Sequence, residues 1–202
     1  MSTGKKVLIS GFEPFGGSDL NSSQLVVEAI SKESFTGLEL SAVILPVEFD
    51  KAAKVLFSKV RELDPEIVIS FGQAEGRKAI TPEKIAINLD SARIPDNAGE
   101  MRVNKVIIEA GADGYFSTLP IEKMVVAVKE CGLDGEISLS ARAFLCNHIF
   151  YHLQHQLFER GIKSGFVHLP LVNEQLAQYP DQPSWTLEDL IRGVKAAILS
   201  TI

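Results

Sequence analysis

The sequence has little of what marks several large classes of protein. Only two cysteines occur, Cys131 and Cys146, and in a reducing compartment both are expected to be free thiols. The longest apolar runs, such as 42–47 and 124–128, are too short to span a bilayer, so no membrane partner is expected. The start of the chain offers only the short apolar segment 7–9, which is too short for the core of a signal peptide. A cytoplasmic location is therefore predicted.

Basic charge is scarce as well. The 202 residues carry 20 Lys and Arg against 26 Asp and Glu, which leaves a formal net charge of −6 and no basic stripe for phosphates. Nucleic acid is therefore not an expected partner. The composition, 46% hydrophobic and 23% charged, is that of an ordinary globular protein. Without repeats or low-complexity tracts, a single domain over residues 1–202 is expected, large enough to bury its core without disulfides or a structural metal.

Buried strands alternate with amphipathic helices along the chain. The near-continuous apolar segments 7–10 and 67–71 are typical of strands covered on both faces. Further strands are predicted at 38–47, 81–89, 135–139 and 166–168, and helices after Asn21 or Ser22, after Asp50 as N-cap, and at 121–130, 145–160 and 186–199. This alternation predicts an α/β fold of three α/β/α layers, with one open, twisted, mixed and mostly parallel sheet covered by helices on both faces. Segment 171–185 has no clear pattern and is expected to be a flexible loop.

Three loops follow predicted strands at the edge where α/β sheets place ligands, namely 11–19, 72–80 and 140–144. The first begins GFEPFGG, but it lacks the dinucleotide fingerprint GxGxxG and the GK[ST] end of a P-loop. Its two phenylalanines, Phe12 and Phe15, suggest the apolar wall of a pocket. The alternative, which this segment alone favours, is a loop that only packs against the domain.

Cys146 lies at or near the first turn of a predicted helix. Unpaired backbone N–H groups and the helix dipole there lower the pKa of a thiol and make its thiolate more available. The competing interpretation is a small buried residue at the edge of the apolar helix face, and spacing alone favours it. Cys131 is the poorer nucleophile, because it ends a helix, where the dipole has the wrong sign.

A nucleophilic cysteine needs a base, and four histidines are available. His148, His152 and His155 share one helical face, and a solvated polar face is favoured over a metal site because no HExxH pattern is present. His168 follows an apolar strand, where it suits either a cleft or a satisfied core position. Spacing does not rank the possible third members of a triad, which are Glu83, Asp90, Asp96 and Asn88. The residues alone therefore lead to an α/β protein with the parts of a cysteine–histidine hydrolase.

Six motifs carry a resemblance to a known family. They are GFEPFGG at 11–17, ITPEKIAIN at 80–88, ARIPDN at 92–97, FSTLP at 116–120, FLCN at 144–147 and GFVHLP at 165–170. With these motifs the chain resembles the pyroglutamyl peptidases of the pyrrolidone-carboxylate peptidase family, a group of cysteine peptidases. Each motif alone is weak, but their order and spacing together are specific from residue 7 to residue 170.

The resemblance implies a reaction and a catalytic triad. Cys146 is expected to be the nucleophile, His168 its base and then the acid for the leaving amine, and Glu83 the group that orients the imidazole. Oxyanion stabilisation is expected from the Cys146 N–H with help from Arg93. The implied reaction removes an N-terminal pyroglutamyl residue from peptides through an acyl-enzyme, with no metal or cofactor. Family members are often homotetramers, so an oligomer is expected.

The resemblance also implies a pocket for a neutral five-membered lactam. Four side chains are expected to provide its apolar faces: Phe12, Phe15, Ile94 and Phe144. Gln73 is expected to hydrogen-bond the lactam. An ordinary N-terminal ammonium would be costly to bury in such a pocket without a partner, and this cost would supply selectivity.

The chain departs from the usual family pattern at several positions. Arg142 stands where glycine is usual, and Glu75 where a small residue is usual; Leu171, Asn173 and Ser22 replace an aromatic residue, a proline and a proline. None of these changes removes a triad member, so they bear on turnover and leaving-side preference. They also motivate an alternative, a non-catalytic binder of a small lactam or amide ligand. A nucleoside phosphorylase rests only on similar α/β layering and is the weakest hypothesis.

Overall fold

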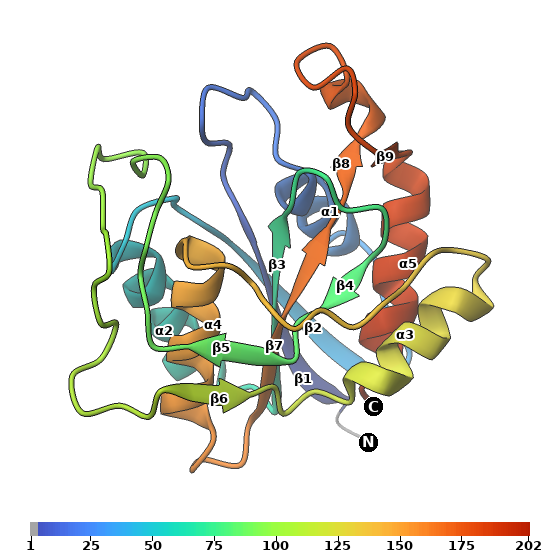
Figure 1. Ribbon diagram of the computed structural model, residues 1–202. Helices are drawn as coiled ribbons and strands as arrows, with labels where there is room; N and C mark the ends of the chain where they lie inside the picture. The colour runs from blue at the N-terminus through green and yellow to red at the C-terminus, as the bar shows by residue number, and fades with distance from the viewer. Residues whose placement is uncertain (1–3) are drawn as a thin grey trace.

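The computed structural model describes residues 4–202, and a five-stranded sheet runs through its centre (Figure 1). Its strand order is β2-β1-β3-β7-β4, and every neighbouring pair is parallel except β4 with β7. The strands of this sheet are β1 (Lys5–Phe12), β2 (Leu38–Leu45), β3 (Ile67–Gln73), β4 (Thr81–Pro82) and β7 (Lys163–Leu169). The sheet is therefore mixed and mostly parallel, as predicted.

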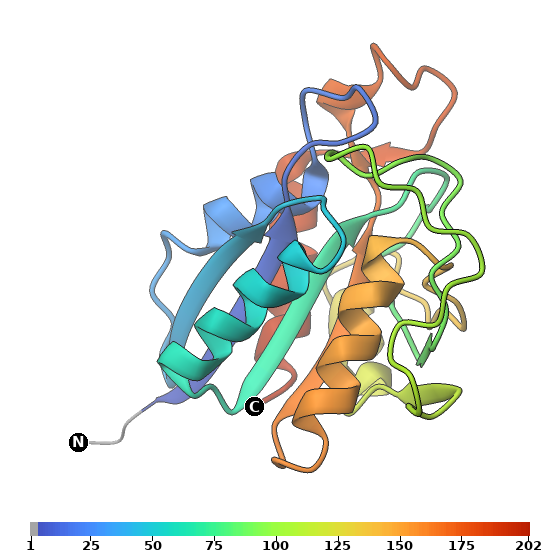
Figure 2. The same cartoon turned by 90° about the vertical axis from the view of Figure 1, so that its left-hand side faces the viewer.

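Helices cover both faces of this sheet, which confirms the three-layer prediction. They are α1 (Ser22–Ile30), α2 (Lys51–Leu63), α3 (Ile121–Glu130), α4 (Leu145–Leu157) and α5 (Leu187–Leu199). Helices α2 and α4 lie on one face, in front of the strands in Figure 2, and α1, α3 and α5 pack together on the other. Within residues 4–202, no helix is long and apolar enough to cross a membrane.

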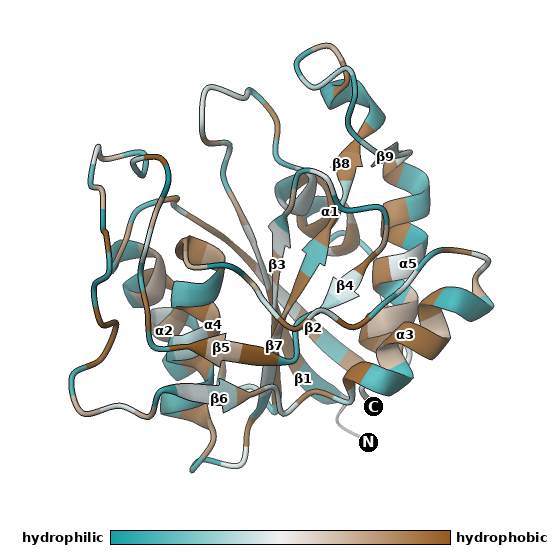
Figure 3. Ribbon diagram, viewed as in Figure 1, coloured by the Kyte–Doolittle hydropathy of each residue, from teal (hydrophilic) through white to brown (hydrophobic). Residues whose placement is uncertain are grey.

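Two hydrophobic clusters, one on each face of the sheet, form the core. Because successive strand residues point to opposite faces, Phe166 belongs to the cluster under α2 and α4, while Val167 belongs to the cluster under α1, α3 and α5. Figure 3 shows hydrophobic and hydrophilic residues alternating along the helices, as expected for helices with one covered side. Parallel strands that are buried on both faces explain why their sequences are apolar almost throughout.

The helix and strand predictions fail mainly in the middle of the chain. The segment 81–89 forms two short strands instead of one, because β4 pairs with β7 whereas β5 (Ile85–Ile87) pairs with the unpredicted β6 (Gly114–Phe116). The strand predicted at 135–139 is absent; only the isolated bridges of Gly135 to Ile80 and of Ser138 to Glu83 form there.

Two further expectations differ from the structure. Asp50 precedes α2 but its side chain caps no N–H of that helix; it binds Arg102 at 2.8 Å instead. The segment 171–185 is not an unstructured loop. It contains β8 (Leu171–Val172), the 3₁₀ helix η1 (Asn173–Gln175) and β9 (Ser184–Trp185), and β8 pairs with β9.

Candidate active site

The candidate site lies at the carboxyl ends of the central strands. Strands β3 and β7 are neighbours, and their register places Gly72 opposite His168. Phe12 ends β1 and Gln73 ends β3, so the sheet brings these two expected residues and His168 to one edge. The loop after β1 and the segment after β8 rise beyond this edge, at the top of Figure 1. This is the edge at which α/β sheets place their ligands.

A buried histidine–carboxylate pair is the centre of the site. His168 Nδ1 lies 2.7 Å from Glu83 Oε1, and both residues are buried. Glu83 reaches this position because β4 runs antiparallel to β7 and because its N–H donates to Phe166 O at 2.9 Å. The contact fixes the imidazole through Nδ1, which leaves Nε2 for proton transfer.

Arg77 extends this pair, and the sequence alone had not singled it out. Its guanidinium donates to Glu83 Oε1 at 2.8 Å, to Thr81 Oγ1 at 2.9 Å and to Ser140 O at 3.1 Å. Its place in the loop after β3 was the only available signal, since that loop already belonged to the candidate edge. Arg77 ties the glutamate to two other segments and gives its buried charge a partner.

The pKa values of Glu83 and His168 are both shifted in the direction that suits His168 as a general base. Burial tends to raise the pKa of Glu83, but the hydrogen bond from His168 and the charge of Arg77 hold that pKa below its usual value. Burial lowers the pKa of His168, against the pull of Glu83, and the charges of Arg77 and Arg142 lower it further. Glu83 is therefore ionised and His168 neutral near pH 7.

Cys146 is the second residue of α4 and lies over the same strand pair. A Cβ atom added to Gly72 would lie only 2.9 Å from Cys146 Sγ, so the sulfur occupies the space that this glycine leaves open. Because Gly72 pairs with His168, the sulfur and the imidazole belong to the same corner of the site. The Cys146 N–H lies in the first helical turn and donates to no acceptor within residues 4–202.

The Cys146 thiol is not activated in advance. Burial raises the pKa of this thiol to about 12, and the negative charge of Glu83 adds to the effect while Arg77 opposes it. The backbone N–H of Cys146 lowers this pKa, as expected of a helix terminus, but burial outweighs it and the net shift is upward. A sulfur held as a thiol needs a base to remove its proton.

Aromatic side chains from three segments gather beside the sulfur. The rings of Phe15 and Phe144 have centroids 6.2 Å apart, and those of Phe12 and Phe166 are 6.3 Å apart. Ile94 is 41% exposed and lies near the same loop, since its Cδ1 would be 3.7 Å from a Cβ on Gly16.

Two loops of this apolar wall are bound to each other. Asn97 Nδ2 donates to Glu13 Oε1 and to Pro14 O, both at 2.9 Å. The segment 92–97 is thereby held against the loop that carries Phe15. The structure thus brings the expected apolar residues to one region from distant parts of the chain.

The two polar side chains expected to bind substrate, Gln73 and Arg93, differ in their hydrogen bonds. Gln73 Oε1 accepts hydrogen bonds from Ser22 N at 2.9 Å and from Gln175 Nε2 at 2.8 Å. The Arg93 side chain is exposed and forms no hydrogen bond within residues 4–202, so its oxyanion role stays a prediction.

Comparisons with known proteins agree with this geometry. The sequence profile of the family described as pyroglutamyl peptidase matches residues 5–202. The chain belongs to the pyroglutamyl peptidase family. It is 42% identical over 198 residues to the pyrrolidone-carboxylate peptidase of Vibrio vulnificus strain YJ016, which covers 98% of this chain and 93% of that protein. It is 43% identical over 196 residues to the same-named protein of Streptococcus suis strain 05ZYH33, covering 96% and 90%.

Solved structures of this family have the same fold as the chain. The crystal structure of pyroglutamyl peptidase I from Bacillus amyloliquefaciens matches with a TM-score of 0.95 and 36% identity, over 98% of this chain and 95% of that one. A mutant pyrrolidone carboxyl peptidase from the hyperthermophile Pyrococcus furiosus matches with a TM-score of 0.93 and 36% identity, over 97% of each chain.

Two departures from the usual pattern of pyroglutamyl peptidases lie near Arg77 and Glu83. Arg142 has a φ of 62°, a left-handed conformation that glycine adopts without strain, so the backbone explains why glycine is usual there. Glu75 is exposed in the loop after β3. Both line a hollow of about 870 Å³ that Arg77 also borders. Of the two, Arg142 carries a charge that lowers the pKa of His168.

The other candidate carboxylates have different partners in this member of the pyroglutamyl peptidase family. Asp90 Oδ2 lies 2.9 Å from His148 Nδ1, and both residues are fully buried. The prediction of a solvated histidine face is therefore wrong for His148, because Asp90 pairs with it in the interior. Asp96 accepts from the backbone N–H of Phe49 at 2.9 Å. Among residues 4–202, no three His, Cys, Asp or Glu side chains are grouped as a metal site would require.

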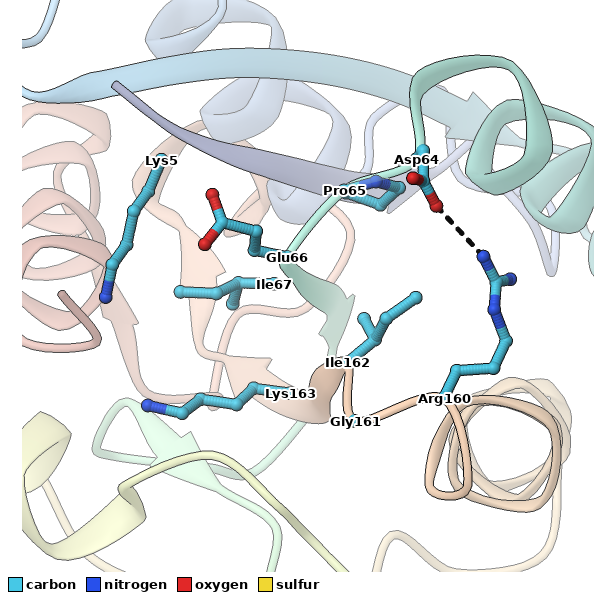
Figure 4. Close-up of a pocket in the computed structure, with 9 residues that line it drawn as sticks. All are labelled: Lys5, Asp64, Pro65, Glu66, Ile67, Arg160, Gly161, Ile162 and Lys163. Atoms are coloured by element: carbon cyan, nitrogen blue, oxygen red, sulfur yellow. Dashed lines mark hydrogen bonds and ion pairs between the residues drawn. The ribbon is translucent and has the colours of Figure 1, made fainter. Parts of the chain in front are cut away.

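A second hollow lies at the opposite edge of the sheet (Figure 4). Its volume is about 350 Å³, and it is lined at the amino ends of strands by residues such as Lys5, Ile67 and Lys163. Its charged groups are of both signs, and Asp64 pairs there with Arg160 at 3.0 Å. Its lining contains neither cysteine nor histidine, the two residue types that a cysteine peptidase uses as nucleophile and base.

Proposed function

We propose that the chain hydrolyses the amide bond that follows an N-terminal pyroglutamyl residue of a peptide. Membership of the pyroglutamyl peptidase family supports this reaction. The arrangement of Cys146, His168 and Glu83 supports an acyl-enzyme mechanism of the cysteine-peptidase type. The reaction needs no cofactor, since a thiol, an imidazole and water supply every group that it uses.

The first half-reaction forms a thioester. His168 Nε2 takes the Cys146 proton as the sulfur attacks the carbonyl carbon of the pyroglutamyl group. The tetrahedral oxyanion accepts a hydrogen bond from the unpaired Cys146 N–H, and Arg93 adds positive charge from the neighbouring loop. Glu83 stabilises the imidazolium that forms. The intermediate then collapses, and His168 gives its proton to the leaving amine.

The second half-reaction releases the acid. Neutral His168 takes a proton from water, whose oxygen attacks the thioester carbon. Collapse of this intermediate expels the sulfur, which regains a proton from His168. The products are 5-oxoproline and the shortened peptide, and the enzyme returns to its thiol form. The raised pKa of the Cys146 thiol, about 12, makes the proton transfer to His168 an essential step of each cycle.

Recognition of the pyroglutamyl ring follows from its neutrality. Phe12, Phe15, Phe144 and Ile94 provide apolar contact, and Gln73 provides a hydrogen bond to the lactam. An N-terminal amino acid with a free ammonium would lose its hydration among these rings and gain no carboxylate partner. The pocket therefore excludes ordinary peptides by the cost of desolvation.

One observation carries the proposal: the 2.7 Å contact of His168 with Glu83 lies at the strand pair over which Cys146 Sγ is placed. The test is release of a fluorescent amine from a pyroglutamyl amide under reducing conditions, for wild type and Cys146→Ala. We expect turnover in wild type and its loss in the variant. Full activity of Cys146→Ala would refute the mechanism, and tight lactam binding without turnover by wild type would favour the non-catalytic binder.

We also propose that the chain acts as one peptidase domain, in the cytoplasm and as a homotetramer. The family resemblance supports the oligomer, and the free thiols of Cys131 and Cys146 fit a reducing compartment. Light scattering after size-exclusion chromatography measures the number of subunits directly. A monomer at micromolar concentration would overturn the oligomer prediction and leave the reaction untouched.

A further inference from the structure

Gln175 is a buried amide in the segment for which the sequence predicted no structure. It ends η1 and is only 3% exposed. Its Oε1 accepts from the Val172 N–H at 3.1 Å, and its Nε2 donates to Leu20 O at 3.1 Å and to Gln73 Oε1 at 2.8 Å. Every hydrogen-bonding atom of this side chain is therefore used inside the protein.

These contacts determine which way each amide points. A backbone N–H can only donate, so the Gln73 atom that faces the Ser22 N–H at 2.9 Å must be the oxygen. The Val172 N–H fixes the oxygen of Gln175 by the same logic, and its amino group must then face Gln73. The two amides are consistent with each other in only one orientation.

The amino group of Gln73 is left free by these contacts. Its Oε1 already accepts two hydrogen bonds, while its Nε2 donates to no acceptor within residues 4–202. Gln73 therefore offers N–H donors alone to a ligand at the carboxyl end of β3. A lactam carbonyl accepts hydrogen bonds and therefore matches this donor. An N–H or O–H group of a ligand would find no acceptor on the Gln73 side chain.

We propose that Gln175 is a positioning residue for substrate specificity, which locks the Gln73 amide with its N–H groups toward the carbonyl of the pyroglutamyl ring. This inference rests on the proposed function, which identifies the pyroglutamyl ring as the ligand. It assigns a role in substrate selection to the segment after β8, which lies outside the triad. The same side chain joins this segment to Leu20, just before α1, and to Gln73 at the end of β3.

The test uses a nearly isosteric change. In Gln175→Glu the carboxylate still accepts from the Val172 N–H but has no hydrogen to donate to Gln73 Oε1. Two oxygens then face each other, so the orientation of the Gln73 amide that the Ser22 N–H requires is opposed by the new carboxylate and is no longer locked. Gln175→Met removes both polar atoms at similar volume and serves where the glutamate variant folds poorly. Gln178→Glu is the matched control, since Gln178 is exposed in the same segment and its side chain, within residues 4–202, donates only to Gly17 O at 3.3 Å.

Two measurements separate positioning from a general structural effect. The first is the dissociation constant of 2-pyrrolidone, the bare lactam ring, from the folded protein by calorimetry; the second is KM and kcat on a pyroglutamyl amide. We expect Gln175→Glu to raise both the dissociation constant and KM by about tenfold, with kcat within about twofold of wild type and no effect of Gln178→Glu. In a Gln73→Met background, Gln175→Glu should change neither constant further.

Three outcomes would overturn the inference. They are an unchanged affinity for 2-pyrrolidone in Gln175→Glu and Gln175→Met, an equal loss with and without the Gln73 amide, and a wild type that does not bind the ring at all. Absence of turnover on the pyroglutamyl amide, together with Gln175-dependent binding of 2-pyrrolidone, would reject the proposed function and leave the role of Gln175 in place.

Discussion

Two buried histidine–carboxylate pairs in this molecule look alike and differ in what surrounds them. His168 meets Glu83 at 2.7 Å and His148 meets Asp90 at 2.9 Å, each through Nδ1. An arginine binds each carboxylate as well, Arg77 at 2.8 Å from Glu83 and Arg102 at 3.1 Å from Asp90. The pairing of an imidazole with a carboxylate and a guanidinium therefore does not by itself make a catalytic centre.

The difference lies at the second ring nitrogen. His148 Nε2 is buried without a hydrogen-bond partner, with Asp50 Oδ1 3.7 Å away and the edge-on Phe49 ring beside it. No nucleophile is placed against it. His168 lies instead opposite Gly72, where Cys146 Sγ fills the space beside it. A proton acceptor becomes a general base only where a proton donor and the substrate can both reach it.

The largest effect should come from replacing each histidine. His168→Gln should lower kcat/KM of the folded protein by about 10³-fold or more, because the thiol loses the base that removes its proton. It should also lower stability, because buried Glu83 loses a partner. His148→Gln should destabilise the protein by about 3 kcal/mol, because the buried Asp90 charge loses a partner. Activity assays on folded protein and urea unfolding measure the two quantities.

These two variants test the comparison because both should lower stability but only His168→Gln should remove the activity of the protein that stays folded. A folded His168→Gln enzyme with near wild-type activity would show that the first pair is not catalytic. A stable His148→Gln protein with strongly reduced kcat would show that the second pair takes part in the reaction.

The sequence predicts only part of the difference between the His168–Glu83 pair and the His148–Asp90 pair. Its motifs lead to Cys146, His168 and Glu83, and hydrophobic patterns predict helix 121–130 and the buried strands. Periodicity cannot show that Asp90 turns inward to His148, because that pairing joins positions 58 residues apart. Segment 171–185 defeats pattern analysis for a similar reason, since long-range contacts such as Gln175 to Gln73 hold it in place.

The next effect concerns the space over Gly72, beside His168, which Cys146 Sγ fills. Gly72→Ala adds a methyl group 2.9 Å from Cys146 Sγ and 2.7 Å from the Phe166 ring, so the sulfur must move. We expect kcat/KM to fall by about 10²-fold, since a displacement of about 1 Å is enough for such a loss. Gly165→Ala is the matched control on β7, where a Cβ would lie 2.4 Å from Ser117 Oγ and 2.7 Å from Leu119 Cδ1.

Both glycine variants should lower the midpoint of urea unfolding, because each overfills a packed interior. Only Gly72→Ala should also reduce the activity of the protein that remains folded. Equal specific activity in the two variants would mean that the clearance over Gly72 does not set the position of the sulfur.

A smaller effect should follow from removing the arginine of each pair. In Arg77→Gln the positive charge that lowers the pKa of His168 is lost, so this pKa rises. The reaction needs neutral His168, hence the acid limb of the profile of kcat/KM against pH should move to higher pH. We expect a loss of about tenfold at neutral pH. Arg102→Gln should leave the acid limb unchanged and lower stability, because buried Asp90 loses its guanidinium.

The stability of the first pair also depends on pH with a defined sign. The pKa of Glu83 is held low in the folded state, so its contribution is present at neutral pH and disappears as pH falls through that lowered value. The pKa of His168 is also lowered, and the unfolded chain therefore binds more protons as pH falls below about 6.5. In Arg77→Gln the pKa of Glu83 should rise, so its contribution to stability should disappear at a higher pH. The pKa of His168 should rise toward its unfolded value, so the stability that His168 removes at acid pH should shrink. NMR titration measures both pKa values, and an unchanged Glu83 pKa in Arg77→Gln would contradict this assignment.

The smallest effect is expected at Arg142, where two variants separate the effect of its charge from that of backbone strain. Arg142→Gly should stabilise the protein by about 1 kcal/mol, because glycine adopts the φ of 62° without the clash that a Cβ causes. The same change removes a charge that lowers the pKa of His168, so the acid limb should move slightly to higher pH, by less than in Arg77→Gln. Arg142→Gln keeps the Cβ and removes only the charge; it should move the acid limb equally and leave stability unchanged. If Arg142→Gly lowers the unfolding midpoint instead, the arginine makes contacts that outweigh its strain, and the departure from glycine is a gain in stability.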